Sequence, residues 1–168
     1  MVKALRFRIS IVGLGSVWRE FVVDSEISFY DLHLIIQRVM GWENYHLHEF
    51  DVSDVKIGMI DDEIYGELLD EKKVLLKEYI LKKGQSFGYL YDFGDDWEHK
   101  IVVKEVLDGD VGSSVKGKGC CPPEDCGGVF GYKDMLEILK DEGHANYTET
   151  REWVGEDFDS ERFEVLEL

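Results

Sequence analysis

The sequence predicts an α+β fold in which antiparallel β-hairpins pack against two main helices. Apolar residues alternate with polar ones near the N-terminus and again over 87–107, which is the period of half-buried strands. They recur with helical spacing over 32–40 and 132–139. The chain has 168 residues, of which 44% are hydrophobic and 12% aromatic, enough for one packed core. We therefore expect a single domain over residues 1–168.

The N-terminal part is predicted to form a hairpin followed by a helix. Residues 4–11 alternate as a strand, 13–16 form a glycine-rich turn, and 17–23 return as the second strand. Ser28 and Asp31 form a capping-box pattern before an amphipathic stripe, and Gly41 is placed to end that helix. A helix that crosses the sheet after a hairpin would give a β-grasp-like opening.

The middle of the chain predicts shorter elements. Residues 47–52 are expected to form a strand and 57–65 to include another. Residues 74–83 predict a short helix ended by Gly84. A second hairpin follows, with arms near 87–93 and 97–107. Residues 108–128 contain six glycines and predict a long connection, which is either mobile or held in place by other contacts.

The last third is predicted to be mainly helical. Tyr132, Met135 and Leu139 mark an amphipathic helix closed by Gly143. A shorter helix is expected to begin near Asn146 or Thr148 and to stop at Gly155. The tail is expected to form a turn and a short packed segment.

Charge and composition exclude several classes of protein. The net charge is −17, with −4 on residues 1–84 and −13 on residues 85–168. Such an acidic surface repels phosphate backbones, so nucleic-acid binding is disfavoured. The chain lacks an apolar run of membrane-spanning length and a signal-peptide core, so we expect a cytoplasmic protein with no membrane partner. Three cysteines, an odd number, do not indicate a secreted disulfide framework.

The second hairpin carries the densest group of reactive side chains. Asp95 and Asp96 follow Gly94, as turns prefer, because short Asp side chains bond their own backbone. Asp92 lies within the arm beside aromatic residues and is the more distinctive carboxylate. Trp97 and His99 alternate with the apolar face of the return arm, where Trp97 would wall a pocket. His99 is either a core histidine bonded to a backbone carbonyl or carboxylate, or a ligand or general base.

Two further histidines, His46 and His48, are candidates for a site. In a strand, residues i and i+2 share a face, which would place both imidazoles about 6–7 Å apart, within reach of one ion. The alternative is an exposed or edge pair just after a turn. A histidine pair without a fixed carboxylate partner is a weak metal signal.

The cysteine loop (residues 120–127) is a third candidate region. Four residues separate Cys121 from Cys126, which is at the upper limit of zinc-ligand spacing, and two prolines stiffen the turn between them. The alternatives are buried thiols in a proline-defined turn, or a redox disulfide, which a reducing compartment disfavours. If the loop folds over the hairpin tip, Glu124 and Asp125 would meet the carboxylates and histidines there.

The motifs of this chain are together similar to the plasmid pRiA4b ORF-3-like family. The resemblance covers nearly the whole chain and rests on 91–99, 121–128 and 131–139, with Trp18-Arg19, Gly41-Trp42 and 46–50. It implies an α+β domain of prokaryotes, often near mobile elements, without an established activity. Some relatives carry a transposon-resolvase label, but a serine recombinase needs arginines around a scissile phosphate, and the acidic half of this chain offers the opposite field. Glu20 stands where the family often places a second arginine.

Three functional hypotheses follow. The leading one is a non-catalytic binding or interaction module that engages a protein or small-molecule ligand near the 89–99 hairpin. The second is a divalent-metal-dependent hydrolase, with zinc as the candidate cofactor, and the third is a nucleic-acid-processing accessory of a mobile element. The candidate ligand-binding residues are His46, His48, Asp92, Trp97, His99 and Glu124, and the candidate metal ligands are Cys121 and Cys126. No catalytic residue is assigned.

Overall fold

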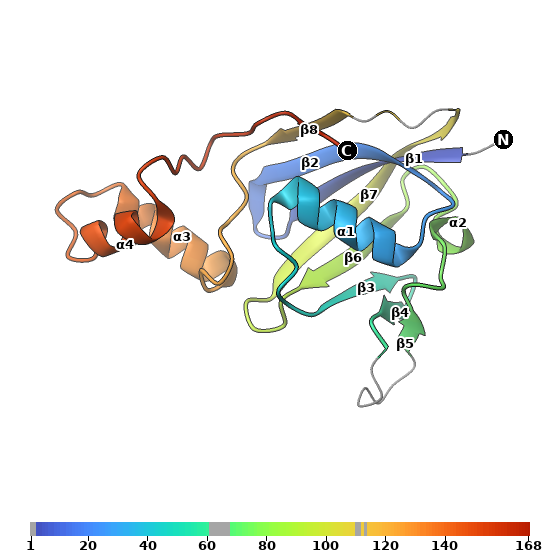
Figure 1. Ribbon diagram of the computed structural model, residues 1–168, viewed down its shortest axis with the longest axis horizontal. Helices are drawn as coiled ribbons and strands as arrows, with labels where there is room; N and C mark the ends of the chain where they lie inside the picture. Colours follow the sequence, from blue (N-terminus) through green and yellow to red (C-terminus); the bar gives the residue numbers. More distant parts are fainter. Residues whose placement is uncertain (1–2, 61–67, 110–111, 113) are drawn as a thin grey trace.

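The strands form one large sheet, and the helices lie on one face of this sheet and at one of its ends (Figure 1). The computed structural model describes residues 3–60, 68–109, 112 and 114–168. The strands are β1 (Lys3–Ile11), β2 (Leu14–Asp24), β3 (His48–Val52), β4 (Val55–Gly58), β5 (Leu68–Asp70), β6 (Ser86–Tyr91), β7 (Trp97–Asp108), β8 (Ser114–Lys118) and β9 (Leu166–Glu167). The helices are α1 (Phe29–Met40), α2 (Leu76–Tyr79), α3 (Gly128–Leu139) and α4 (Tyr147–Val154).

The strands are ordered β5-β4-β3-β6-β7-β1-β2-β8-β9. Neighbours are antiparallel except for β4 and β5, which are parallel. The two predicted hairpins, β1–β2 and β6–β7, lie side by side at the centre because β1 also pairs with β7. The α+β fold class is thereby confirmed.

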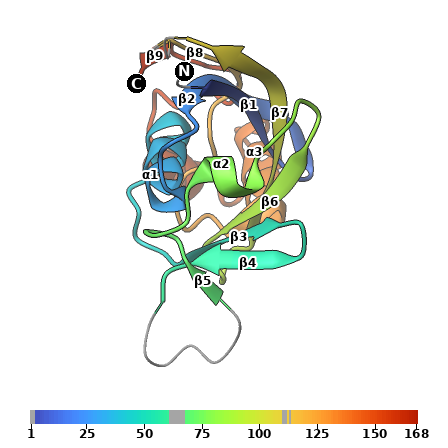
Figure 2. The ribbon, with the colours of Figure 1, turned by 90° about the vertical axis from the view of Figure 1, so that its right-hand side faces the viewer.

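Helix α1 covers one face of the sheet, and α2 lies beside it on the same face (Figure 2). Ser28 caps α1 as the sequence predicts: its hydroxyl accepts from the Asp31 backbone N–H, and the Asp31 carboxylate accepts from the Ser28 N–H. Gly41 ends the helix at φ 80°, in the left-handed region that favours glycine. The buried side of α1 packs on aromatic residues of the strands, with Phe29 in edge contact with Phe50 at 5.2 Å between ring centroids.

The second long helix, α3, lies at the end of the sheet and packs with α4, rather than across the sheet face (Figure 1). Tyr132 and Met135 bury its inner side against the core. The helix ends at Leu139, before the predicted Gly143, whereas α4 ends at Gly155 as expected. Within the described ranges, no helix is long and apolar enough to cross a membrane.

The structure refines one prediction in the middle of the chain and corrects another. The 108–128 connection, expected to be either mobile or held in place by other contacts, contains β8, which pairs with β2. Val115 is the only apolar residue of β8, so no alternation marked it as a strand. The helix predicted over 74–83 is only the single turn α2. Residues 61–65 of the predicted 57–65 strand lie outside the described residues; β4 covers its beginning.

Candidate functional site

The tip of the β6–β7 hairpin is a tight turn organised by Asp92. Asp92 has φ 60°, and its Oδ1 accepts hydrogen bonds from the Gly94 and Asp95 N–H groups at 2.9 and 3.3 Å. Its carbonyl accepts from the Asp96 N–H at 2.7 Å. Oδ1 of Asp92 is therefore used by the hydrogen bonds of the turn. The other carboxylate oxygen, Oδ2, lies 3.5 Å from His46 Nε2.

The segment between α1 and β3 brings His46 to this tip. The Tyr45 N–H donates to the Tyr91 hydroxyl at 3.1 Å, and the Asp92 N–H donates to the Leu47 carbonyl at 2.9 Å. Further back, the Trp42 indole N–H donates to the Pro122 carbonyl at 2.9 Å and stacks on Tyr91. These bonds fix the path of the segment, so the position of His46 is determined by its neighbours.

The cysteine loop folds over the hairpin tip, the condition under which Glu124 and Asp125 were expected to meet it. The Glu124 carboxylate accepts from the Glu43 N–H at 2.8 Å and from the Tyr91 hydroxyl at 3.1 Å. Burial and the Glu124 charge raise the pKa of Tyr91, so its hydroxyl stays protonated and donates.

The loop is held close to the tip by backbone contacts as well. The Gly127 N–H donates to the Asp95 carboxylate at 3.0 Å. A Cβ at Gly128 would lie 2.3 Å from the Asp95 carbonyl oxygen, so only glycine permits this approach.

Four side chains from three separate segments converge as a result, and we call them the His46 site: His46, Asp92, Glu124 and Asp125. The His46 Nε2 lies 3.5 Å from Asp92 Oδ2, 3.7 Å from Glu124 Oε2 and 2.9 Å from Asp125 Oδ1. The ligating atoms of His46, Asp92 and Asp125 all lie within 4.8 Å of one another. His46 Nε2 is nevertheless inaccessible to solvent and makes no hydrogen bond, because the nearest oxygen is not aligned with it.

The charge of the His46 site is not balanced by basic side chains. Among the described residues, no lysine or arginine lies within 4 Å of its three carboxylates; their ion-pair contacts are all with His46. The Asp92 side chain is only 10% exposed, whereas Asp125 is 66% exposed. The His46 site thus combines a buried carboxylate, Asp92, with a partly buried imidazole and a solvent-exposed carboxylate, Asp125.

His48 does not share this site, although it is only two residues from His46. Its Nε2 is bonded to Glu71 Oε2 at 2.6 Å, and both side chains are buried. Its ring stacks on His33 with 3.4 Å between centroids. The strand face that the sequence predicts for the two histidines does not exist, because β3 begins at His48 and His46 precedes it.

His33 belongs to a buried hydrogen-bond network that the sequence did not reveal. Its Nε2–H donates to Asn44 Oδ1 at 2.7 Å, and its Nδ1 accepts from the Tyr89 hydroxyl at 2.9 Å. The Gln37 amide donates to the same hydroxyl at 3.0 Å. Burial, with a smaller contribution from His48, lowers the pKa of His33 to about 4. A histidine on the apolar stripe of α1 was the available signal.

Trp97 and His99 lie in the core rather than in the His46 site. Both are almost fully buried, and the His99 Nδ1–H donates to the Tyr89 carbonyl at 3.2 Å, which is the core alternative considered from the sequence. Burial lowers the pKa of His99 to about 4. Trp97 and His99 pack with Trp42 beneath the tip.

The cysteines do not converge on the His46 site either. Cys120, Cys121 and Cys126 are free thiols, and the group of possible metal ligands found among the described residues contains none of them. Burial, with the nearby Asp95 charge, raises the pKa of Cys126 to about 12, and burial also raises the pKa of Cys121. Neutral, partly buried thiols match the alternative of a proline-defined turn.

Known proteins match this chain over nearly its full length. The profile of the family described as plasmid pRiA4b ORF-3-like protein matches residues 3–167. An uncharacterised protein of Sinorhizobium fredii, y4hQ, is 41% identical over 150 residues, which is 86% of this chain and 77% of that protein. The crystal structure of a protein of unknown function from Methanosarcina mazei Go1, MM3350, superposes with a TM-score of 0.86 at 38% identity, covering 98% of this chain and 96% of that one. The chain therefore belongs to the plasmid pRiA4b ORF-3-like family.

Proposed function

We propose that this protein is a binding module whose His46 site holds a divalent cation. One observation carries the proposal: a histidine nitrogen and three carboxylates from three segments converge within 3.7 Å of that nitrogen, and the nitrogen makes no hydrogen bond. Carboxylates of this density repel one another, and a cation placed between them and the imidazole would remove that repulsion.

The donor set fits a first-row divalent ion. Neutral imidazole and carboxylate oxygens are ligands of zinc and manganese, at about 2.0–2.2 Å for zinc. The ligating atoms of His46, Asp92 and Asp125, now within 4.8 Å of one another, would draw closer around such an ion. Asp125 is the most exposed of the four, while Asp92 is fixed by its bonds in the turn.

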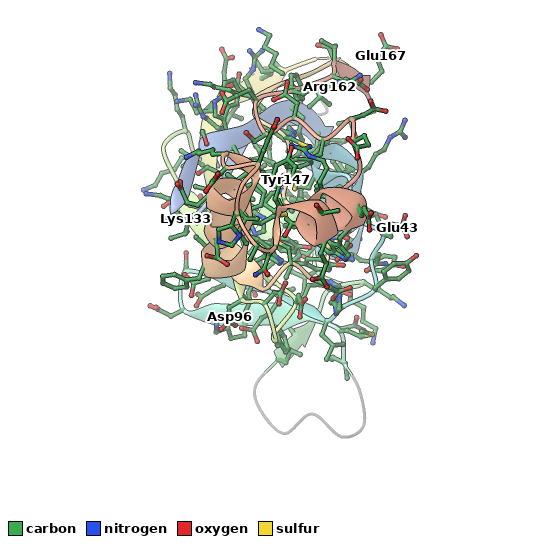
Figure 3. All side chains as sticks on the ribbon, turned by 90° about the vertical axis from the view of Figure 1, so that its left-hand side faces the viewer. Glu43, Asp96, Lys133, Tyr147, Arg162 and Glu167 are labelled. Atoms are coloured by element: carbon green, nitrogen blue, oxygen red, sulfur yellow. The ribbon has the colours of Figure 1, made fainter. Side chains whose placement is uncertain are left out.

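A cation at this position would tie together three segments that form one surface. The segments are the loop before β3, the hairpin tip and the cysteine loop; Figure 3 looks onto this end of the molecule, with Glu43 and Asp96 labelled. Tyr45, Leu47 and Phe93 on these segments are at least half exposed. Exposed apolar side chains beside an ordered ion are suited to contact a protein or a small ligand.

The test is direct measurement of metal on protein purified without a metal-affinity tag. Calorimetric titration with zinc should give one ion per chain, and His46→Gln and Asp92→Asn should each weaken binding by about tenfold or more. Asn retains the acceptor that Asp92 uses in its turn, so that variant keeps the fold.

Asp96→Asn is the matched control. It removes the same charge from the same hairpin tip, and Asp96 contributes no atom to the His46 site. Cys121→Ser and Cys126→Ser should also bind zinc normally. Absence of saturable zinc binding by the native protein, or equal weakening in Asp96→Asn and Asp92→Asn, would overturn the proposal.

The hydrolase hypothesis requires the same cation, so it can be tested only if the zinc titration shows binding. A hydrolase would in addition turn over a substrate in a zinc-dependent manner that Asp92→Asn removes. The nucleic-acid hypothesis stays disfavoured by the net charge of −17. Salt-sensitive DNA binding by the native chain would overturn that view.

A further inference from the structure

A cavity separate from the His46 site is lined in part by Cys120 and Cys121 of the cysteine loop and contains a buried arginine, Arg19. We call it the Arg19 cavity; its volume is about 430 Å³. Its walls are the end of α1, Cys120 and Cys121, and the tail segments 157–159 and 162–164. This volume is within the range of small-molecule sites, about 300–1,000 Å³.

Arg19 is 4% exposed and is held by backbone carbonyls alone. Its Nε–H donates to Val39 at 3.0 Å, and its Nη1 donates to Trp18 and Lys118 at 2.9 Å each. The Phe163 ring lies 4.7 Å from the guanidinium carbon. These contacts fix the plane of the guanidinium and leave its Nη2 group unused by any described residue.

The backbone around Arg19 is shaped to admit this side chain. Gly117 of β8 is in register with Arg19, and a Cβ there would lie 2.9 Å from Arg19 Cδ and 2.7 Å from the Phe163 ring. A buried cation normally has a carboxylate partner. Among the described residues, the ion pairs of arginines involve Arg6 and Arg162 but not Arg19.

We propose that the Arg19 cavity binds a small organic carboxylate, with the anion at the unused Nη2 of Arg19 and an apolar body against Met40, Phe158 and Phe163. Burial lowers the pKa of Arg19, and a bound anion would offset that cost. Arg162, labelled in Figure 3, also lines the cavity, where its guanidinium is paired with Glu164.

The remaining wall residues narrow the class of ligand. Asp157 and Asp159 also line the cavity, and the charge of Glu164 is offset by Arg162. A dianionic phosphate or a polyanion would therefore be repelled more strongly than a monoanion. Nε and Nη1 of Arg19 already donate to backbone carbonyls, so only Nη2 is available to an anion and the usual bidentate pairing with a carboxylate cannot form. A monoanion with an apolar body is the chemistry that satisfies both limits.

Benzoate and its neutral analogue benzamide are suitable probes, because they differ mainly in charge. In an NMR titration of the full chain, benzoate should shift the amide signals of 39–41, 120–121 and 158–163 saturably, and bind about tenfold more tightly than benzamide. Benzoate should also slow alkylation of Cys120 by iodoacetamide, followed by peptide mass mapping. Equal behaviour of the two probes, or no saturable shift, would overturn the proposal.

Variants assign the effect to the cavity. Arg162→Gln should weaken benzoate binding, because it leaves the negative charge of Glu164 uncompensated in the cavity wall. Arg38→Gln, which removes the same charge from an exposed site outside the cavity, should not. Arg19→Met should abolish the preference for benzoate over benzamide. If Arg19→Met fails to fold, Arg162→Gln and Cys120 protection still decide the proposal: equal binding by Arg162→Gln and Arg38→Gln, together with unprotected Cys120, would contradict it.

Discussion

His46 and His48 are separated by one residue, yet they occupy opposite kinds of environment. His46 faces three carboxylates at a partly open site, and its Nε2 makes no hydrogen bond. His48 is buried, bonded to one carboxylate at 2.6 Å and stacked on a second histidine. The first arrangement leaves a nitrogen available to an ion; the second uses its nitrogen to satisfy a buried carboxylate.

The difference arises from where β3 begins. His48 is the first residue paired with β6, opposite Tyr91, so its side chain follows the alternation of the sheet and enters the core. His46 lies before the paired region, and its direction is set by the bonds of Tyr45 and Leu47 to β6 and the hairpin tip. Spacing alone therefore does not assign two histidines to one face unless both lie within the strand.

The largest expected effect comes from breaking the buried pair. Glu71 is 1% exposed, and its carboxylate contacts His48. Glu71→Ala should lower the free energy of unfolding by about 3 kcal/mol or more, since it leaves a buried histidine without its partner. Urea denaturation followed by fluorescence measures this loss.

Glu71→Gln is the isosteric control and should cost less, because the amide oxygen can still accept from His48 Nε2. A loss below about 1 kcal/mol for Glu71→Ala would show that the pair behaves like an exposed one and would remove the contrast with His46.

The next effect concerns the pH dependence that the buried histidines give to stability. His99 has a pKa lowered from 6.5 to about 4 by burial, so the unfolded chain binds more protons between these values. Stability from this group is therefore full above pH 6.5 and is lost as the pH falls toward 4, by up to about 3 kcal/mol. His33, whose pKa is also about 4, contributes in the same direction.

His99→Asn tests this assignment, since its amide can still donate to the Tyr89 carbonyl but does not titrate. The variant should lose less stability than the native chain between pH 6.5 and 4, measured by urea denaturation at each pH. Parallel curves for His99→Asn and the native protein would contradict the buried assignment.

The sequence predicted the features that neighbouring residues encode and missed those that depend on contacts between distant segments. The β1–β2 hairpin, α1 with its Ser28 cap and the β6–β7 hairpin were predicted because each is encoded by neighbouring residues. β8 was missed because a short strand with one buried residue has no periodic signal. The α+β class needed only the local patterns.

The candidate site depended on loop paths, which local patterns do not specify. Of the candidates His46, His48, Asp92, Trp97, His99 and Glu124, the fold brings His46, Asp92 and Glu124 together. Asp125 was expected beside them only if the cysteine loop folded over the tip. Glu71 was not foreseen as the partner of His48, because the two are 23 residues apart and meet only in the folded chain. Trp97 and His99 were candidate ligand-binding residues, with a core position as the alternative for His99; the alternation of β7 directs both side chains into the core.

A smaller effect concerns Asp92, which belongs to both the turn and the His46 site. Asp92→Ala should lower the free energy of unfolding by about 2 kcal/mol, because alanine is strained at φ 60° and the Gly94 and Asp95 N–H groups lose their acceptor. Asp92→Asn should be close to neutral by the same urea measurement. Equal losses in the two variants would assign the stabilising role to the charge instead of the turn.

The smallest expected effect also has the opposite sign. In the presence of a chelator, Asp125→Asn should raise the free energy of unfolding by about 0.5 kcal/mol, because it removes repulsion within an exposed group of like charges. With zinc at 100 times its dissociation constant, the native chain should gain about 2.7 kcal/mol, and the variant less, so the order of the two proteins reverses. Thermal unfolding in chelator and in zinc measures both signs with the same samples. A variant that is less stable than the native chain in chelator would mean that the Asp125–His46 contact stabilises the fold, as the Glu71–His48 pair does, and the contrast between the two histidines would then be one of exposure alone.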